Sequence, residues 1–286
     1  MCVIVLNFNN WADTNKCLES LRVLDYPNCQ ILVVDNGSSD RPPCDLTGRF
    51  PAVELLNNTE NLGFAGGNNR GIRHALRLGA EYVWLLNNDT RVQPLSLRAM
   101  VETAEKDARV GAVGSILLNG TGKLRVEAWG GGEVSLLTGL PSHLQGKSSG
   151  RLDYLCGASL LLRRDALEDV GMLDEKFFLY WEDADLCFRL RARGWKLAVA
   201  ETAWIIHKSS GSSVFQSTLY DYHFTASSIR FFRLHARFWL LPSFVSVAGR
   251  VVCRFLAAKP ASARAVLDGF VLGISRSLKV GRLRPQ

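Results

Sequence analysis

The chain has 286 residues, 47% of them apolar, which is enough to bury one substantial core with or without an appendage. Its seven cysteines are scattered and contain no Cys-x-x-Cys pair, which favours reduced thiols in a cytosolic compartment over a disulfide or zinc framework. The formal charge of +7 is uneven. Residues 230–286 hold eleven Lys/Arg against one acid, so residues 1–229 sum to −3.

Short apolar runs alternate with helical patterns through the first half of the chain. Strands are expected, in order, over residues 2–7, 31–35, 53–57, 82–87 and 110–118. Helices are expected between them, over residues 14–24, 67–78 and 95–107. This alternation predicts an α/β fold made of βαβ units around a largely parallel sheet.

Three of the expected strands finish in polar side chains, Asn7, Asp35 and Asn87. Parallel strands of an open α/β sheet end at one edge, where such folds bind ligands, so three polar ends predict a site. Asp35 begins the run DNGSSD, whose residue types are typical of a turn, and a turn alone would explain them. In a binding site, Asp35 would accept hydrogen bonds from a nucleobase. The fourth strand leads directly into Asn88 and Asp89.

A glycine-rich stretch, NLGFAGGNNRG at residues 61–71, leads into the second expected helix. Its glycines have neither the spacing of a phosphate loop nor that of a dinucleotide fingerprint. Gly66 and Asn68 still suit the close approach of an anionic ligand at a helix start. The alternative is a flexible loop.

The segment FFLYWEDADLCFRLRARGW, residues 177–195, predicts a helix over 182–193. Acids in its first turn complement the helix dipole, which explains Glu182 and Asp185 without any function. Asp183 differs, because its neighbours at helical spacing are apolar and none is basic. Such a carboxylate resists ionisation, which suits a general base, so Asp183 is our candidate for catalysis.

His207 ends the apolar run AWIIH, where a lone histidine is usually structural. It becomes a candidate metal ligand if it converges with Asp89. One carboxylate, one imidazole and phosphate oxygens together suit a hard divalent cation.

Six segments in this order resemble family 2 glycosyltransferases, and most of all the bacterial rhamnosyltransferase-like branch that builds cell-surface polysaccharides: VIVLNFNN, VVDNGSSD, NLGFAGGNNRG, LLNNDT, GMLDEKFFLYWEDADLCFRLRARGWKL and AWIIHKSSGSS. The likeness covers roughly residues 1–215. It implies a GT-A fold with a mixed, mostly parallel sheet. It also implies an inverting transfer of a sugar from a nucleotide-diphosphate donor, such as TDP-rhamnose or a UDP-sugar.

The resemblance also implies roles for individual residues. Asp183 would be the catalytic base, and Asp89 and His207 would bind a divalent metal, Mg²⁺ or Mn²⁺. Donor contacts would come from the strand ends and the glycine-rich stretch: Asn7, Asp35, Gly66, Asn68, Asn87 and Asn88. The acceptor would meet Trp181 and Glu182 just before the base, although packing in the core explains this aromatic run equally well.

Two positions depart from the family's pattern. Asn87 stands where the family has the first acid of its Asp-x-Asp motif, so Asp89 must carry more of the metal binding. Asn68 stands where many relatives have Arg, which weakens any basic contact to the donor phosphates. Two other interpretations stay open: a nucleotidyltransferase, which would carry a basic residue in its glycine-rich loop, and a non-catalytic nucleotide-binding or membrane-surface scaffold, which Asn87 supports.

From about residue 216 onward the pattern is helical, with Arg among Phe, Trp, Leu and Val. We therefore expect two domains, residues 1–215 and 216–286. Cationic amphipathic helices suit an acidic membrane surface, where a lipid-linked or glycan acceptor could be met; the alternative is a solvated helix packed on the first domain. The start of the chain lacks the basic flank of a secretory leader, so we expect a cytoplasmic protein, peripheral on the inner-membrane surface. Nucleic-acid binding is not expected, because the basic tail contains no recognition module.

Overall fold

The computed structural model describes residues 1–44, 46–120, 124–147, 151–208 and 217–280. These residues pack as two compact units. The α/β unit lies within residues 1–133, 143–176 and 183–208, and the helical unit within residues 134–142, 177–182 and 217–280.

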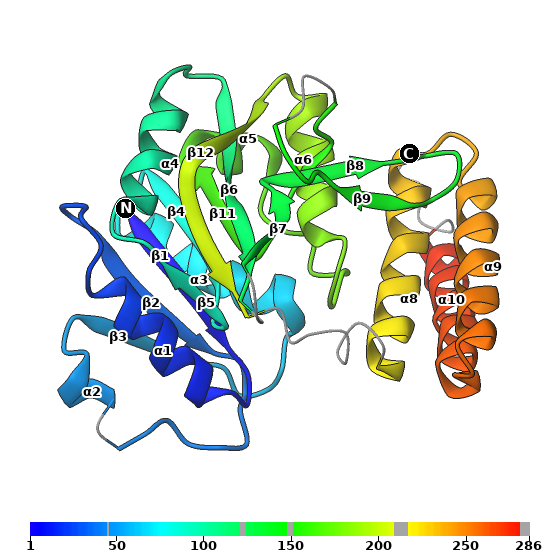
Figure 1. Ribbon diagram of the computed structural model, residues 1–286, viewed down its shortest axis with the longest axis horizontal. Helices are drawn as coiled ribbons and strands as arrows, with labels where there is room; N and C mark the ends of the chain where they lie inside the picture. The colour runs from blue at the N-terminus through cyan, green and yellow to red at the C-terminus, as the bar shows by residue number, and fades with distance from the viewer. Residues whose placement is uncertain (45, 121–123, 148–150, 209–216, 281–286) are drawn as a thin grey trace. The chain divides into compact units, whose positions relative to one another are not determined.

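The α/β unit is built on a nine-stranded mixed sheet, whose order is β3-β2-β1-β4-β11-β6-β12-β5 with β7 paired to β6 (Figure 1). Its strands are β1 Cys2–Asn7, β2 Gln30–Asp35, β3 Val53–Asn57, β4 Tyr82–Asn87, β5 Thr90–Val92, β6 Val110–Asn119, β7 Arg125–Trp129, β11 Ser159–Arg163 and β12 Lys196–His207. Strands β3, β2, β1 and β4 are parallel neighbours, β11 is antiparallel to β4 and β6, and β6 and β12 are parallel again. The five strands expected from the sequence are confirmed.

Helices cover both faces of this sheet. They are α1 Trp11–Leu21, α2 Leu46–Arg49, α3 Gly63–Arg77, α4 Ser96–Glu105, α5 Arg164–Val170 and α6 Glu182–Ala192. Alternate strand residues face opposite sides. Val3 and Val5 therefore join a core with Leu18 of α1 and Met100 of α4, whereas Ile4 lies against α3. A small second sheet, in the order β10-β8-β9, consists of β8 Gly131–Val134, β9 Pro141–His143 and β10 Tyr154–Leu155.

The glycine-rich stretch lies largely inside α3 rather than ahead of it, since the helix begins at Gly63 and not at residue 67 as expected. A Cβ atom at Gly71 would lie 2.8 Å from a methyl of Ile4, and one at Gly67 would lie 2.5 Å from a methyl of Leu6. Because real Cβ atoms do not approach so closely, these two glycines let the helix backbone rest directly on β1. The flexible-loop alternative is wrong for this stretch.

The helical unit contains three helices, α8 Thr218–His235, α9 Leu240–Leu256 and α10 Pro260–Val280. Figure 1 shows them side by side, and Ile229, Val247 and Val266 form their shared core. The helical pattern expected from residue 216 onward is confirmed. The expected boundary between residues 215 and 216 falls outside the described residues and stays a prediction.

Among the helices within the described residues, none is long and apolar enough to cross a membrane. All seven cysteines lie within the described residues and are free.

Candidate active site

The polar ends of the parallel strands meet at one edge of the sheet. Asn7 is paired in register with Asp35, and Leu6 with Asn87, so these strand ends are adjacent as expected. The Asn7 amide donates to Asp35 Oδ1 over 3.1 Å, and the Ser38 hydroxyl donates to the same oxygen. The other oxygen of Asp35, Oδ2, has no partner in the described part of the chain. A nearly buried carboxylate is thus held by one oxygen and leaves the other for a ligand.

The two amides that follow β4 have different surroundings. The Asn88 side chain donates to Thr14 Oγ1 over 2.9 Å and to the Asn10 carbonyl over 3.3 Å, so it ties the β4 end to the start of α1. The Asn87 side chain makes no hydrogen bond within residues 1–44, 46–120, 124–147, 151–208 and 217–280. The NH2 group of Asn88 is therefore satisfied by the fold, whereas the whole side-chain amide of Asn87 is available to a ligand.

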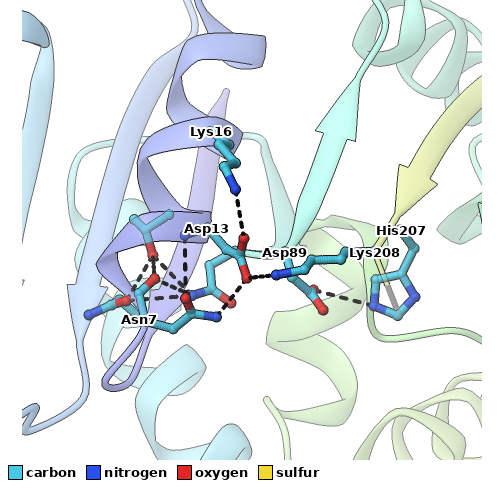
Figure 2. Close-up of polar contacts among 9 residues, drawn as sticks. Asn7, Asp13, Lys16, Asp89, His207 and Lys208 are labelled. Atoms are coloured by element: carbon cyan, nitrogen blue, oxygen red, sulfur yellow. Dashed lines mark hydrogen bonds and ion pairs between the residues drawn. The ribbon is translucent and has the colours of Figure 1, made fainter. Parts of the chain in front are cut away.

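Asp89 and His207 converge, as the metal hypothesis requires. His207 ends β12 and pairs across the sheet with Thr90, the residue after Asp89. Its Nε2 lies 3.3 Å from Asp89 Oδ1 (Figure 2), and its Nδ1 lies 3.1 Å from Glu127 Oε2. Burial disfavours a charged imidazole, but the hydrogen bonds to Asp89 and Glu127 outweigh it and raise the pKa of His207 to about 9.

Glu127 is a site residue that the sequence analysis missed. Strand β7 pairs with β6 through Val126 opposite Leu118 and Ala128 opposite Leu117, so Glu127 is the extra residue of a β-bulge. A bulge turns a side chain away from the regular alternation, and bulges are frequent beside active sites. The sequence signal was weak, because RVEAW looks like an ordinary strand with one polar residue.

The donor set at Asp89 and His207 suits a divalent cation that shares its other positions with phosphate. Among the described residues, no group of three or more His, Cys, Asp or Glu side chains could hold a metal by itself. The two carboxylates lie at different nitrogens of the ring, so Glu127 cannot share an ion held at Nε2 with Asp89. It can accept the Nδ1 proton, the usual arrangement behind a metal-binding histidine. A hard or borderline cation with one carboxylate, one imidazole and phosphate oxygens fits this chemistry.

Asp183 lies half-buried in the first turn of α6 and forms no salt bridge among the described residues, although the His143 imidazole acts on it electrostatically. Its Oδ2 accepts from the Gly157 backbone N–H over 2.9 Å, and its Oδ1 accepts from the N–H of Ala184 over 2.8 Å. Burial raises the pKa of the Asp183 carboxyl, and these two hydrogen bonds offset the shift only in part. The role of Asp183 as general base, expected from the sequence, stays a prediction.

Backbone contacts place Asp183 at the same sheet edge as the strand ends. Strand β11 runs antiparallel to β4, so the residues just before β11 lie at the carboxyl end of β4. The Asn87 N–H donates to the Ala158 carbonyl over 3.0 Å, and the neighbouring Gly157 N–H is the one that holds Asp183. Asp183 and Asn87 are therefore bonded to two consecutive residues, Gly157 and Ala158, which brings the general-base candidate close to the free amide.

The remaining predicted donor contacts lie in α3. Gly66 and Asn68 are both buried, and the Asn68 amide donates to the Phe64 carbonyl over 3.0 Å, one turn back in the same helix. Asn36, which the sequence analysis did not select, joins this region to the strand ends. It donates to the Gly63 carbonyl over 3.0 Å and accepts from the Asn58 amide over 2.8 Å. A network of amides thus holds α3 against the site edge.

The predicted acceptor residues, Trp181 and Glu182, belong to the helical unit and are buried. The Trp181 ring packs on Phe231 with centroids 4.8 Å apart, as the core-packing alternative foresaw. Tyr180 and Trp181 both have positive φ, 68° and 72°, which non-glycine residues adopt at a cost of about 1–2 kcal/mol each. Such strain is frequent where a side chain is held for a function.

A pocket of about 280 Å³ borders Asp89 between the start of α1 and the end of β12. The Lys208 ammonium is 2.7 Å from Asp13 Oδ2, and Lys16 approaches the other oxygen at 3.6 Å (Figure 2). Although burial opposes it, the hydrogen bonds and charges of these partners keep the pKa of the Asp13 carboxyl low. This ion pair fixes the residue after His207 to α1.

Comparisons with known proteins agree with this architecture. Residues 2–171 match the model of glycosyl transferase family 2. A relative from Mycobacterium tuberculosis, an N-acetylglucosaminyl-diphospho-decaprenol L-rhamnosyltransferase, is 27% identical over 74% of this chain and 76% of its own length. A hexosyltransferase of low-salt glycan biosynthesis from Haloferax volcanii is 24% identical over 91% of this chain and 85% of its own.

Among solved structures, a mannosyltransferase from Pyrobaculum calidifontis in complex with GDP-Man and Mn²⁺ aligns with a TM-score of 0.59. The two share 16% identity, and the alignment covers 97% of this chain and 86% of that one. At this identity the likeness concerns the fold, and it confirms the GT-A architecture that the resemblance implied.

The fold and the polar edge of its sheet define a GT-A glycosyltransferase. The chain belongs to glycosyl transferase family 2, because the family model matches more than half of it. It is a glycosyltransferase rather than a nucleotidyltransferase.

Proposed function

We propose that the protein transfers a sugar from a nucleotide-diphosphate donor to a hydroxyl group by a single displacement that inverts the anomeric centre. The observation that carries this proposal is the Asp183 carboxylate at the edge where the strand ends meet, held by two backbone N–H groups and by no salt bridge within the described part of the chain. A scaffold without chemistry has no need of such a group.

The donor lies along this edge in the proposed complex. Asp35, with Oδ2 free, accepts hydrogen bonds from the nucleobase, and Asn87 donates its free amide to the donor. Asn7 and Asn88 position these groups, since both are bonded to neighbours in the network. Gly66 and Asn68 act on the donor by bringing α3 close to it, because within the described residues the Asn68 amide donates to Phe64 of its own helix.

We propose Asp89 and His207 as ligands of a divalent cation, Mg²⁺ or Mn²⁺, with the donor diphosphate completing the shell. A bound divalent ion supplies Lewis-acid stabilisation of the negative charge on the leaving diphosphate. Glu127 accepts the Nδ1 proton of His207, so Nε2, which faces Asp89, is the nitrogen that would give up its proton and bind the cation.

Asp183 removes the proton of the acceptor hydroxyl as its oxygen attacks the anomeric carbon and the bond to the diphosphate oxygen breaks. The electron pair of that bond leaves with the diphosphate, and the proton stays on the carboxyl. The raised pKa of Asp183 makes its carboxylate a stronger base than an exposed aspartate. Its two backbone N–H donors fix both oxygens before the substrate arrives.

The relatives' names point to the substrate classes. A rhamnosyltransferase acting on a decaprenol-linked sugar and a glycan-building hexosyltransferase support a role in cell-surface glycan synthesis. We propose TDP-rhamnose or a UDP-sugar as donor and a lipid-linked or other glycan hydroxyl as acceptor, met at the cytoplasmic face of a membrane. Trp181 and Glu182, directly before Asp183 in the chain, are the proposed acceptor contacts.

A screen of nucleotide sugars tests this proposal. With Mn²⁺ present, one donor class is expected to raise the melting temperature and to be hydrolysed slowly. Asp89→Asn and His207→Gln are expected to abolish the dependence on Mn²⁺ while the metal-free protein still folds. Equal stabilisation of wild type and both variants by the donor and Mn²⁺ would contradict the metal site, and no response to any nucleotide sugar would contradict the function.

A further inference from the structure

Helix α9 carries its charged side chains on the inside and its large apolar side chains on the outside. Arg254 contacts Asp221 of α8 twice, Nε with Oδ2 over 2.9 Å and Nη2 with Oδ1 over 2.9 Å. Arg250 joins the same carboxylate, and its guanidinium lies 4.4 Å from the centre of the Phe224 ring. Asp221 is fully buried. Both arginines of α9 are therefore inside the helical unit.

The opposite side of α9 is exposed and apolar. We call it the outer face of α9, and its members are Leu241, Phe244, Val245, Val252, Phe255 and Leu256. These positions recur at three- and four-residue steps, so they form one stripe along the helix. Phe255 is 60% exposed and Leu256 is 83% exposed, values expected for polar surface residues and not for a helix of a water-soluble bundle.

The helical unit does not need this apolar stripe for its own stability. Single exposed apolar residues are ordinary, but a contiguous exposed patch marks a surface that is covered in the working protein. The inward face already supplies the core contact, since Val247 packs with Ile229 and Val266. The outer face needs a partner of its own.

The charge around the outer face decides which partner fits. Residues 230–286 carry a formal +10, of which Arg250 and Arg254 are paired with Asp221. Arg237, before α9, and Arg264, in the first turns of α10, are exposed cations. A second copy of this chain would bring an equally positive surface to the same contact and would be repelled. An anionic lipid surface attracts these cations and offers an apolar layer below its headgroups.

We infer that α9 docks flat on an anionic membrane, with its outer face at the boundary between headgroups and acyl chains and its flanking cations among the lipid phosphates. The mode differs from the cationic amphipathic helix expected from the sequence, because the arginines within α9 neutralise Asp221 instead of facing the lipid. The inference holds for any reaction of the α/β unit. It also explains how a lipid-linked acceptor would be met.

Vesicle flotation with the full-length protein tests the inference. Vesicles of phosphatidylcholine with phosphatidylglycerol are expected to carry the wild type, and vesicles of phosphatidylcholine alone are expected to carry much less. Leu241→Gln with Phe255→Gln is expected to weaken binding by about tenfold or more, since glutamine keeps the helix while removing apolar area. The matched control is Leu78→Gln with Leu95→Gln, two leucines of the α/β unit that are 54% and 57% exposed, and it should bind as the wild type does.

Two further measurements keep the test decisive. Melting temperature and donor hydrolysis should be unchanged in the α9 variant, so a loss of vesicle binding can be separated from unfolding and from failure of the proposed chemistry. Arg237→Glu with Arg264→Glu should lower binding to anionic vesicles only. Unchanged binding of the α9 variant overturns the inference. A wild-type dimer in sedimentation that the α9 variant abolishes, without vesicle binding, overturns it in favour of a second copy.

Discussion

Two aspartates, one in each unit, have opposite surroundings. Asp221 of the helical unit is fully buried and neutralised by Arg250 and Arg254. Asp183 of the α/β unit accepts from the backbone N–H groups of Gly157 and Ala184 and forms no salt bridge within the described residues. Removing a carboxylate from water is costly, and the arginine partners of Asp221 offset that cost. The comparison indicates that Asp221 serves the fold and that Asp183 is kept reactive.

The largest expected effect is on turnover. Asp183→Asn is expected to lower the transfer rate by about 10²–10⁴-fold, because the amide cannot accept the proton of the acceptor hydroxyl. Donor binding, followed by calorimetry, should change little, since the strand-end residues that hold the donor are untouched. Full activity in this variant would end the assignment of Asp183 as the base and would favour the scaffold interpretation.

The next effect is on stability and concerns the other aspartate. Asp221→Asn is expected to lower the free energy of unfolding by about 3–5 kcal/mol, because two guanidinium groups lose their buried counter-charge. Asp268→Asn is the control. Its side chain is 59% exposed and 3.9 Å from Arg264, and its loss should cost less than about 0.5 kcal/mol. Urea unfolding of both variants gives the comparison, and equal midpoints would show that Asp221 is not structural.

A third effect concerns metal affinity. Glu127→Gln is expected to weaken Mn²⁺ binding by about 10–100-fold, because His207 loses the acceptor that fixes its tautomer. Glu54→Gln is a matched control, since Glu54 lies 2.8 Å from His74 and forms a similar pair elsewhere in the α/β unit. Titration calorimetry with Mn²⁺ and a nucleoside diphosphate measures both. Equal losses in the two variants would point to a general structural effect.

The smallest expected effect is a substitution that stabilises the folded protein, whereas most substitutions destabilise it. The pKa of the Asp183 carboxyl in the folded protein is raised above its ordinary value of 3.8. The protonated carboxyl therefore stabilises the folded state fully below pH 3.8, and this stabilisation is lost as the pH rises through the folded-state pKa. At neutral pH, Asp183→Asn should therefore melt at or above the wild-type temperature, and the advantage should shrink toward about pH 4. Thermal melts across this range check the prediction, and a variant that melts lower at every pH contradicts it.

Much of the site edge could be predicted from local sequence. A buried strand reads as a short apolar run, and its polar end falls at the carboxyl edge whenever the strands are parallel, as for Asn7, Asp35 and Asn87. The lack of a basic partner for Asp183 on its own helix could also be predicted, because helical spacing identifies its neighbours there. These inferences depend on periodicities of two and 3.6 residues, which the chain carries in its order of residues.

Other features depend on how distant segments pair. Glu127 faces His207 because the register of β7 against β6 shifts by one residue at a β-bulge. No pattern within RVEAW predicts that shift. The glycines of α3 were expected near a ligand, but their spacing also suits a helix that rests on β1, and only the packed sheet distinguishes the two. The two arginines of α9 looked like surface cations until Asp221, about thirty residues earlier, was seen to receive them.

By its order of residues alone, this chain determined its strands, the polar edge where they end, and an aspartate without a local counter-charge, since each follows from the periodicity of a single element. Tertiary structure decided which carboxylate orients His207, which amides are already satisfied and which face of α9 is left uncovered. Those outcomes depend on register and burial between elements far apart in the chain, and neither quantity exists until the elements have packed.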